Sequence, residues 1–152
     1  SVVNNVIAFP GQWDCTEPGC DMAGVRSSQH PPNSGGGGPF SSFTFERNIV
    51  LLNNPNATLF YTTIPTGMNN MTLDYNVYWS LVPGATLQFP STQDPTTFAE
   101  WQAEGQDVHS VVANPLFTNA TNYDFSSLDP KSPALALGFV PIDTSTVGPR
   151  PF

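Results

Sequence analysis

One short motif occurs three times in this chain and constrains its fold more than any other feature. Each copy has an apolar residue, two variable positions, an Asn and then a Val or Ile. The copies are Val2–Ile7, Phe45–Val50 and Leu73–Tyr78. Their Asn residues, Asn5, Asn48 and Asn76, are 43 and 28 residues apart. Repeats at such intervals are typical of stacked architectures, in which no single unit buries its own core.

Asn suits the corner of a stacked unit because it tolerates the left-handed backbone and its amide can bond to the Asn of the next unit. A parallel β-helix meets these conditions with short strands, Asn corners and connections of any length. The alternative is that these Asn residues only form turns. A doubly wound sheet would need more helices than this chain predicts, and a β-sandwich would need hairpin turns such as Asn-Gly, which are missing.

The expected strands are β-branched and aromatic segments bounded by Asn, Pro and Gly. They cover residues 2–9, 43–52, 58–63 and 72–79, with a short strand at 85–89 and extended segments at 111–117 and 124–128. One helix is predicted at about 96–104, because Thr97 and Glu100 form a capping box and Gly105 supplies a stop. Residues 10–42 are rich in Gly and Pro without a regular period, which is typical of a functional or disordered loop.

The length predicts a single domain over residues 1–152, with the stacked units in 1–95 and the helix and an irregular C-terminal cap in 96–152. Twelve acidic residues face four basic ones, for a formal net charge of −8. We therefore expect no nucleic acid partner, because no basic stripe neutralises phosphates. No apolar run approaches the length of a transmembrane helix, so we expect no membrane association.

Three sequons and two cysteines indicate a secreted glycoprotein. The sequons begin at Asn56, Asn70 and Asn119, and each would place a glycan on a surface loop. Cys15 and Cys20 have four residues between them, and we expect a local disulfide formed in an oxidising compartment. Neither His lies at a spacing that would complete a zinc site, so no metal site is assigned.

Alignment of the repeats places Val3, Glu46 and Asp74 at equivalent positions. Parallel strands lie roughly 4.8 Å apart, so the carboxylates of Glu46 and Asp74 would project side by side. Two carboxylates about 5 Å apart suit a retaining glycosidase, and their mutual repulsion would raise one pKa. The alternatives are that Arg47 or Arg26 pairs with these acids, or that a calcium ion bridges them.

The loop at 10–42 supplies further candidates. Trp13 offers a stacking face for a sugar, Arg26 can bind the carboxylate of a uronic acid, and His30 can move protons. Asp21 is a third candidate for the catalytic acid. The alternative is that Arg26 and His30 only tether the loop.

Asp107 and His109 follow the predicted helix, and we expect them to fix that turn and to take no part in catalysis.

Several segments together resemble a known group of proteins. They are Gly24–His30, Ser41–Val50, Asp74–Trp79, Trp101–Ser110 and a tail from Ala113 to Ala134. The chain resembles, over residues 1 to about 148, the C-terminal part of secreted right-handed parallel β-helix proteins of the glycoside-hydrolase-like (pectin-lyase-like) type. The resemblance implies an all-β fold, a right-handed parallel β-helix of about three C-terminal coils with one short helix. It implies a polysaccharide ligand and no organic cofactor.

Two features depart from that group. Its members are several hundred residues long, whereas this chain starts within a repeat, which implies a fragment, a processed half or a subunit that stacks on another chain. Residues 10–40, with Cys15 and Cys20, look like an insertion. We therefore hold two hypotheses. The first is an extracellular carbohydrate-active domain that hydrolyses or binds a polysaccharide. The second is a non-catalytic glycosylated structural subunit that assembles through an open sheet edge into a filament or matrix.

Overall fold

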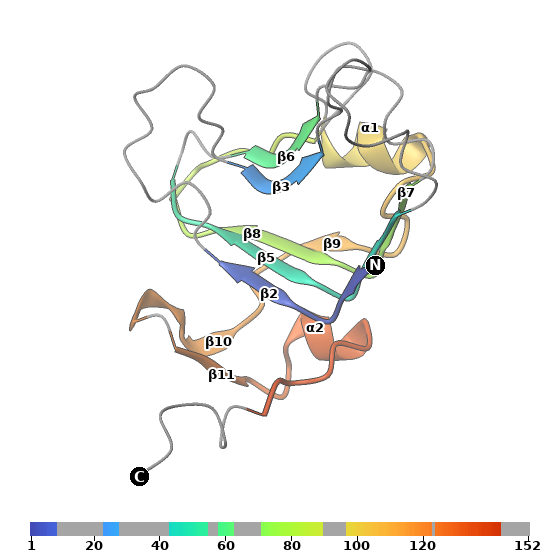
Figure 1. Cartoon of the computed structure of the whole chain (residues 1–152). Helices are drawn as coiled ribbons and strands as arrows, with labels where there is room; N and C mark the ends of the chain where they lie inside the picture. The colour runs from blue at the N-terminus through green and yellow to red at the C-terminus, as the bar shows by residue number, and fades with distance from the viewer. Residues whose placement is uncertain are drawn as a thin grey trace, which may run out of the picture.

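A computed structural model of the chain describes residues 1–8, 23–27, 43–54, 58–62, 71–89, 97–122 and 124–143. This part of the chain consists mainly of parallel β-sheets with two short α-helices (Figure 1). The prediction of an all-β fold with parallel strands is confirmed. Within these residues, neither helix has the length and apolar character that crossing a bilayer would require.

The strands are short, and most end at a corner of the chain. In order they are β1 (Val2–Val3), β2 (Val6–Ala8), β3 (Ala23–Ser27), β4 (Phe43–Glu46), β5 (Ile49–Leu52), β6 (Thr58–Thr62), β7 (Met71–Asp74), β8 (Val77–Ser80), β9 (Val111–Val112), β10 (Phe117–Asn119) and β11 (Asp124–Leu128). The helices are α1 (Phe98–Ala103), the 3-10 turn η1 (Ala120–Asn122) and α2 (Pro133–Ala136).

Three parallel sheets surround a common interior (Figure 1). Their strand orders are β1-β4-β7, β2-β5-β8-β9 and β3-β6. We call the strands at one level of this stack a rung. The first rung is β1, β2 and β3, the second is β4, β5 and β6, the third is β7 and β8, and the fourth is residues 107–112 with β9. Every pairing within the three sheets is parallel and in register, so equivalent residues lie directly over one another.

The three repeated Asn residues form a hydrogen-bonded column at the corner between the first two sheets. The side-chain oxygen of Asn48 accepts the backbone N–H of Asn5 at 3.0 Å and its Nδ2 at 3.1 Å. The side-chain oxygen of Asn76 accepts the same two groups of Asn48 at 2.9 and 3.2 Å. Asn48 and Asn76 are fully buried, at 1% and 0% exposure. The expectation that Asn5, Asn48 and Asn76 stack in a column is therefore confirmed.

The left-handed backbone of each corner lies one residue earlier than the sequence suggested. Asn4, Arg47 and Tyr75 have φ values of 59°, 52° and 57°, whereas the stacked Asn residues do not have positive φ. Two of these three side chains are not Asn, so the conformation is imposed at a cost. The Asn ladder that begins at the next residue helps to offset that cost.

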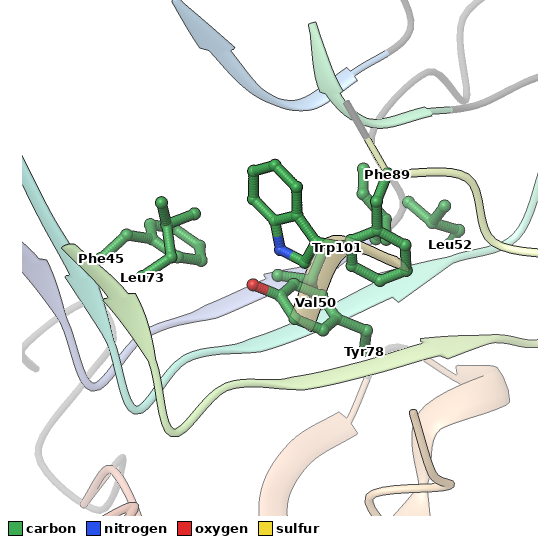
Figure 2. Close-up of a cluster of buried hydrophobic side chains, with 8 residues drawn as sticks. Phe45, Val50, Leu52, Leu73, Tyr78, Phe89 and Trp101 are labelled. Atoms are coloured by element: carbon green, nitrogen blue, oxygen red, sulfur yellow. The ribbon is translucent and has the colours of Figure 1, made fainter. Parts of the chain in front are cut away.

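The interior of the stack is filled by aromatic and aliphatic side chains. Fully or almost fully buried members are Phe45, Val50, Leu52, Leu59, Leu73, Tyr78, Phe89 and Trp101. Figure 2 shows Trp101, which comes from α1, above Tyr78 and beside Phe89. The Phe89 ring packs edge-on to Tyr78 at 5.4 Å and stacks on Trp101 at 6.2 Å between centroids. The capping box of α1, predicted from Thr97 and Glu100, is present and sets where this helix begins.

The opposite face of the four-stranded sheet is covered by the C-terminal segment. Figure 1 shows α2, β10 and β11 on the side of this sheet away from α1. Ile49, Leu51 and Val77 point to this side, where they pack with Ala134 and Phe139. Strand β5 is therefore buried on both faces, which explains its uninterrupted apolar sequence.

Four local predictions need correction. Residues 85–88 are not a strand, and only Phe89 forms an isolated bridge. Strand β3 lies inside the loop predicted at 10–42, because pairing with β6 stabilises a segment that has no pattern of its own. Corners divide the strands predicted at 2–9, 43–52 and 72–79 into β1–β2, β4–β5 and β7–β8. The C-terminal cap contains α2, which begins with Ser132 as N-cap and Pro133 in the first turn.

Replacement of Asn48 by Ala should destabilise the protein by about 3 kcal/mol, because Val2 O and the Asn5 N–H lose their partner and Asn76 Oδ1 loses one of its two donors. Urea unfolding measures this change. The matched control is Asn122→Ala, which removes one exposed side-chain bond and should change stability by less than about 0.5 kcal/mol. Equal effects of the two changes would contradict the role of the ladder.

Candidate functional site

The corner between the first two sheets carries two columns of mostly polar side chains next to the Asn ladder. The register pairs Val3 with Glu46 and Glu46 with Asp74, as the repeats predicted. The second column lies between this one and the ladder. It consists of one residue from each successive rung, namely Asn4, Arg47, Tyr75 and His109. Because neighbouring rungs are in register, side chains that are about 30 residues or more apart in the sequence become neighbours, as Arg47, Tyr75 and His109 do.

Both carboxylates of the predicted pair have partners. Glu46 Oε2 accepts a bond from Arg47 Nη1 at 3.1 Å, so one of the alternative pairings left open by the sequence is present. Asp74 Oδ2 lies 2.7 Å from His109 Nδ1, and Asp74 Oδ1 accepts the backbone N–H groups of His109 and Tyr75 at 2.7 and 2.9 Å. Each acid is therefore paired with a basic side chain on the same corner.

The surroundings of Asp74 favour its ionised form. Burial raises the pKa of this carboxyl, but bonds from the His109 side chain, the His109 backbone and the Tyr75 backbone outweigh burial. The net effect is a pKa below the ordinary value of 3.8. The expectation that one pKa of the pair is raised is therefore not met at Asp74, and this residue carries a negative charge at neutral pH.

Arg47, Tyr75 and His109 form a continuous stack on the corner. The Arg47 guanidinium carbon lies 5.1 Å from the centre of the Tyr75 ring, a cation–π distance. On the other side, the Tyr75 and His109 rings are parallel within 3° and 4.8 Å apart. The stack ends in solvent, because the His109 side chain is 58% exposed. It presents one aromatic face and a nitrogen to an approaching ligand.

His109 is oriented for proton transfer or hydrogen bonding. Its Nδ1 lies against the Asp74 carboxylate, so Nε2 is the ring nitrogen left for a ligand. A carboxylate at Nδ1 favours the tautomer whose Nε2 accepts a proton. The His109–Asp74 pair can therefore act as an acid or base toward a molecule bound at the corner.

Asp107 has a structural role. It is fully buried and accepts bonds from Tyr78, Trp101, Ser110 and Asn76, and Figure 2 shows the first two of these polar groups facing the same point. Burial raises the pKa of Asp107, although each of these bonds acts in the opposite direction. Because no surface reaches it, Asp107 cannot contact a substrate. Its place is in the turn after α1, as the sequence predicted.

The other predicted site residues are only partly described. Arg26 lies in β3 opposite Tyr61, and Asn119 ends β10, where its side chain accepts a bond from Asn122. The residues outside the described part are Trp13, Cys15, Cys20, Asp21, His30, Asn56 and Asn70. Within the described ranges, no group of three or more His, Cys, Asp or Glu side chains lies in a metal-binding arrangement.

Sequence reasoning missed the role of Tyr75 and His109 in this stack. It also missed the fourth rung, in which Ser110 takes the position of the ladder Asn and donates its side chain to Asp107 while accepting the Asn76 N–H at 2.7 Å. Asp107 occupies the position held by Phe45 and Leu73 on the rungs above. Asp107–Val111 would have matched the motif if polar replacements had been allowed at two positions.

Comparisons with models of protein families, with curated proteins and with solved structures found no match to this chain.

The Asp74–His109 contact predicts a pH-dependent contribution to stability. A carboxyl whose folded-state pKa is lowered stabilises the fold above its unfolded pKa, and this contribution is lost as the pH falls through the folded value. The unfolding free energy of wild type minus that of Asp74→Asn should therefore be positive at about pH 6 and shrink below about pH 4. Denaturant unfolding at a series of pH values measures it.

Asp129→Asn is the control, because it removes an exposed carboxylate that caps a backbone N–H outside the corner. A pH dependence in Asp74→Asn identical to wild type would show that the contact with His109 does not bias the ionisation of Asp74.

Proposed function

We propose that this chain is an extracellular carbohydrate-active domain, in which the stacked sheets are a right-handed parallel β-helix of the glycoside-hydrolase-like (pectin-lyase-like) type. The ligand is a polysaccharide that lies along the corner formed by the second, third and fourth rungs. The observation that carries this proposal is the exposed stack of Arg47, Tyr75 and His109 next to the in-register acids Glu46 and Asp74.

The chemistry of this corner fits a sugar. An exposed aromatic face packs against the apolar face of a pyranose ring, while charged groups beside it bond to hydroxyls. His109 supplies the face and Nε2, and the side chains of Glu46 and Arg47 are 23% and 38% exposed. Because adjacent rungs repeat the same position, the corner is an extended strip, which suits a chain of sugars better than a small compact ligand.

Hydrolysis is the stronger form of the proposal. Asp74 is held ionised, so it would be the nucleophile or the group that stabilises positive charge on the sugar. The proton for the leaving group would then come from Glu46, the acid in register with Asp74. The pairing of Glu46 with Arg47 would have to open during such a step. Binding without hydrolysis needs no such rearrangement.

The second candidate function is the non-catalytic structural subunit that assembles through an open sheet edge. One observation favours it. The first rung has no further strand on its outer side in the described part of the chain, and its apolar residues are only half-buried.

The two candidates are separated by an assay on neutral and acidic cell-wall polysaccharides. If the chain is a hydrolase, wild type should release reducing ends, and Glu46→Gln should lower the rate by about 100-fold or more, because the variant cannot donate a proton. Lys131→Met is the control, since Lys131 is exposed and lies in the C-terminal segment, outside the corner. No release by wild type would reject hydrolysis.

Binding is measured separately by affinity electrophoresis in gels that contain the same polysaccharides. His109→Ala should weaken retention about tenfold, in line with the loss of one stacking contact and one hydrogen bond. Lys131→Met should be retained like wild type. If wild type is not retained by any of the polysaccharides, or if both variants behave alike, the corner is not a carbohydrate site.

A further inference from the structure

The first rung differs from the rungs below it in how well it is covered. Val2, Asn5, Val6 and Ile7 are half-buried, whereas their in-register partners on the second rung are at most 1% exposed. Those partners are Phe45, Asn48, Ile49 and Val50. The second rung is covered because the first lies on it. The outer side of β1 and β2, which we call the first-rung face, has the same kind of side chains and lacks that cover.

The Asn ladder is also incomplete at this face. On the second and third rungs, the side-chain oxygen of the Asn accepts both the N–H and the Nδ2 of the Asn one rung above. No residue in the described part of the chain donates to the side-chain oxygen of Asn5. The position that a fourth Asn would occupy is therefore defined by two bonds of known geometry.

The bonds of the Asn5 amide nitrogen also indicate that a strand is missing above the first rung. Asn48 Nδ2 donates to Val2 O and Asn76 Nδ2 donates to Phe45 O, in each case a carbonyl of the rung above. Asn5 Nδ2 has no such carbonyl and donates instead to Val3 O of its own rung, at 2.9 Å. A strand on the first-rung face would restore the pattern of the other rungs.

The sequence of this face does nothing to discourage pairing. Exposed edge strands commonly carry Lys, Pro or inward charges that prevent another strand from adding. Residues 1–8 contain no charged side chain and no Pro. Val3 is 41% exposed, and Val140 and Ile142, on the segment tied to Asn4 by two bonds, are 65% and 44% exposed.

We propose that the first-rung face binds one further rung of parallel β-structure that carries this chain's own motif, an apolar residue, two variable positions, an Asn and a Val or Ile. The Asn of that rung donates its backbone N–H and its Nδ2 to Asn5 Oδ1, and a carbonyl three residues earlier accepts Asn5 Nδ2. Its apolar residues cover Val2, Val6 and Ile7. The inference concerns the first rung and is independent of the glycan site on the lower rungs.

A second copy of this chain does not fit the face as well. Two first-rung faces related by a two-fold axis would bring their strands together antiparallel, whereas every ladder contact here depends on parallel strands in register. The other end of the stack cannot supply the rung either. There Ser110 and Asp107 terminate the ladder, and Trp101 fills the interior.

The test adds a rung to the whole chain. A copy of residues 43–71 is fused directly before Ser1. This places the copy of Asn48 28 residues ahead of Asn5, the spacing that separates Asn48 from Asn76. The matched control is the same fusion with Ala in place of the copy of Asn48. A second control carries the added residues in scrambled order.

The fusion with Asn should melt about 4 °C or more above the Ala control, and backbone amides of β1 and β2 should gain protection from hydrogen exchange relative to the scrambled fusion. Equal melting temperatures of the Asn and Ala fusions would overturn the proposal. So would an added segment that is digested by protease while β1 and β2 stay unprotected. A dimer of the unfused chain in sedimentation, lost in every fusion, would identify a second copy as the occupant and also overturn it.

Discussion

The column of Asn side chains is the interaction on which the rest of this structure depends. Asn48 satisfies two donors of the rung above it and uses its own amide to bond to the rungs on both sides, with almost no exposure to solvent. A buried amide with one missing partner costs far more than an exposed one. Each rung can therefore occupy only one register on the next, and the position of every corner side chain follows from that register.

The candidate site is a consequence of this register. Arg47, Tyr75 and His109 are brought into one stack because each precedes the ladder residue of its rung, and their positions in the sequence have no other relation. The left-handed backbone at Arg47 and Tyr75 turns these side chains outward. The buried ladder and the exposed stack therefore lie on the inner and outer sides of the same corner. A change in the buried column would displace the proposed ligand surface even though no ladder residue reaches it.

The two ends of the ladder are chemically different. The end at the fourth rung is closed, whereas the end at the first rung is the one that we propose binds a further strand. At the fourth rung, Ser110 and Asp107 replace the Asn and the apolar residue, and their bonds to Asn76, Tyr78 and Trp101 use up the polar groups of the column. At the first rung, the Asn5 oxygen meets no donor in the described residues. The column has a direction, because each Asn side-chain oxygen accepts bonds from the rung above it. At the first rung this oxygen therefore needs a donor from a further rung, whereas at the fourth rung Ser110 and Asp107 accept the bonds that Asn76 donates.

Residue types at a fixed local spacing were enough to predict the repeating unit, the equivalence of Glu46 with Asp74 and the capping box of α1. They also predicted the column of Asn5, Asn48 and Asn76. The pairing of β3 with β6, the fourth rung at Ser110 and the stack that ends in His109 became visible only in the folded chain. These features depend on contacts between segments of unrelated pattern. A local sequence cannot encode such contacts, because the energy that selects them comes from the neighbouring rung.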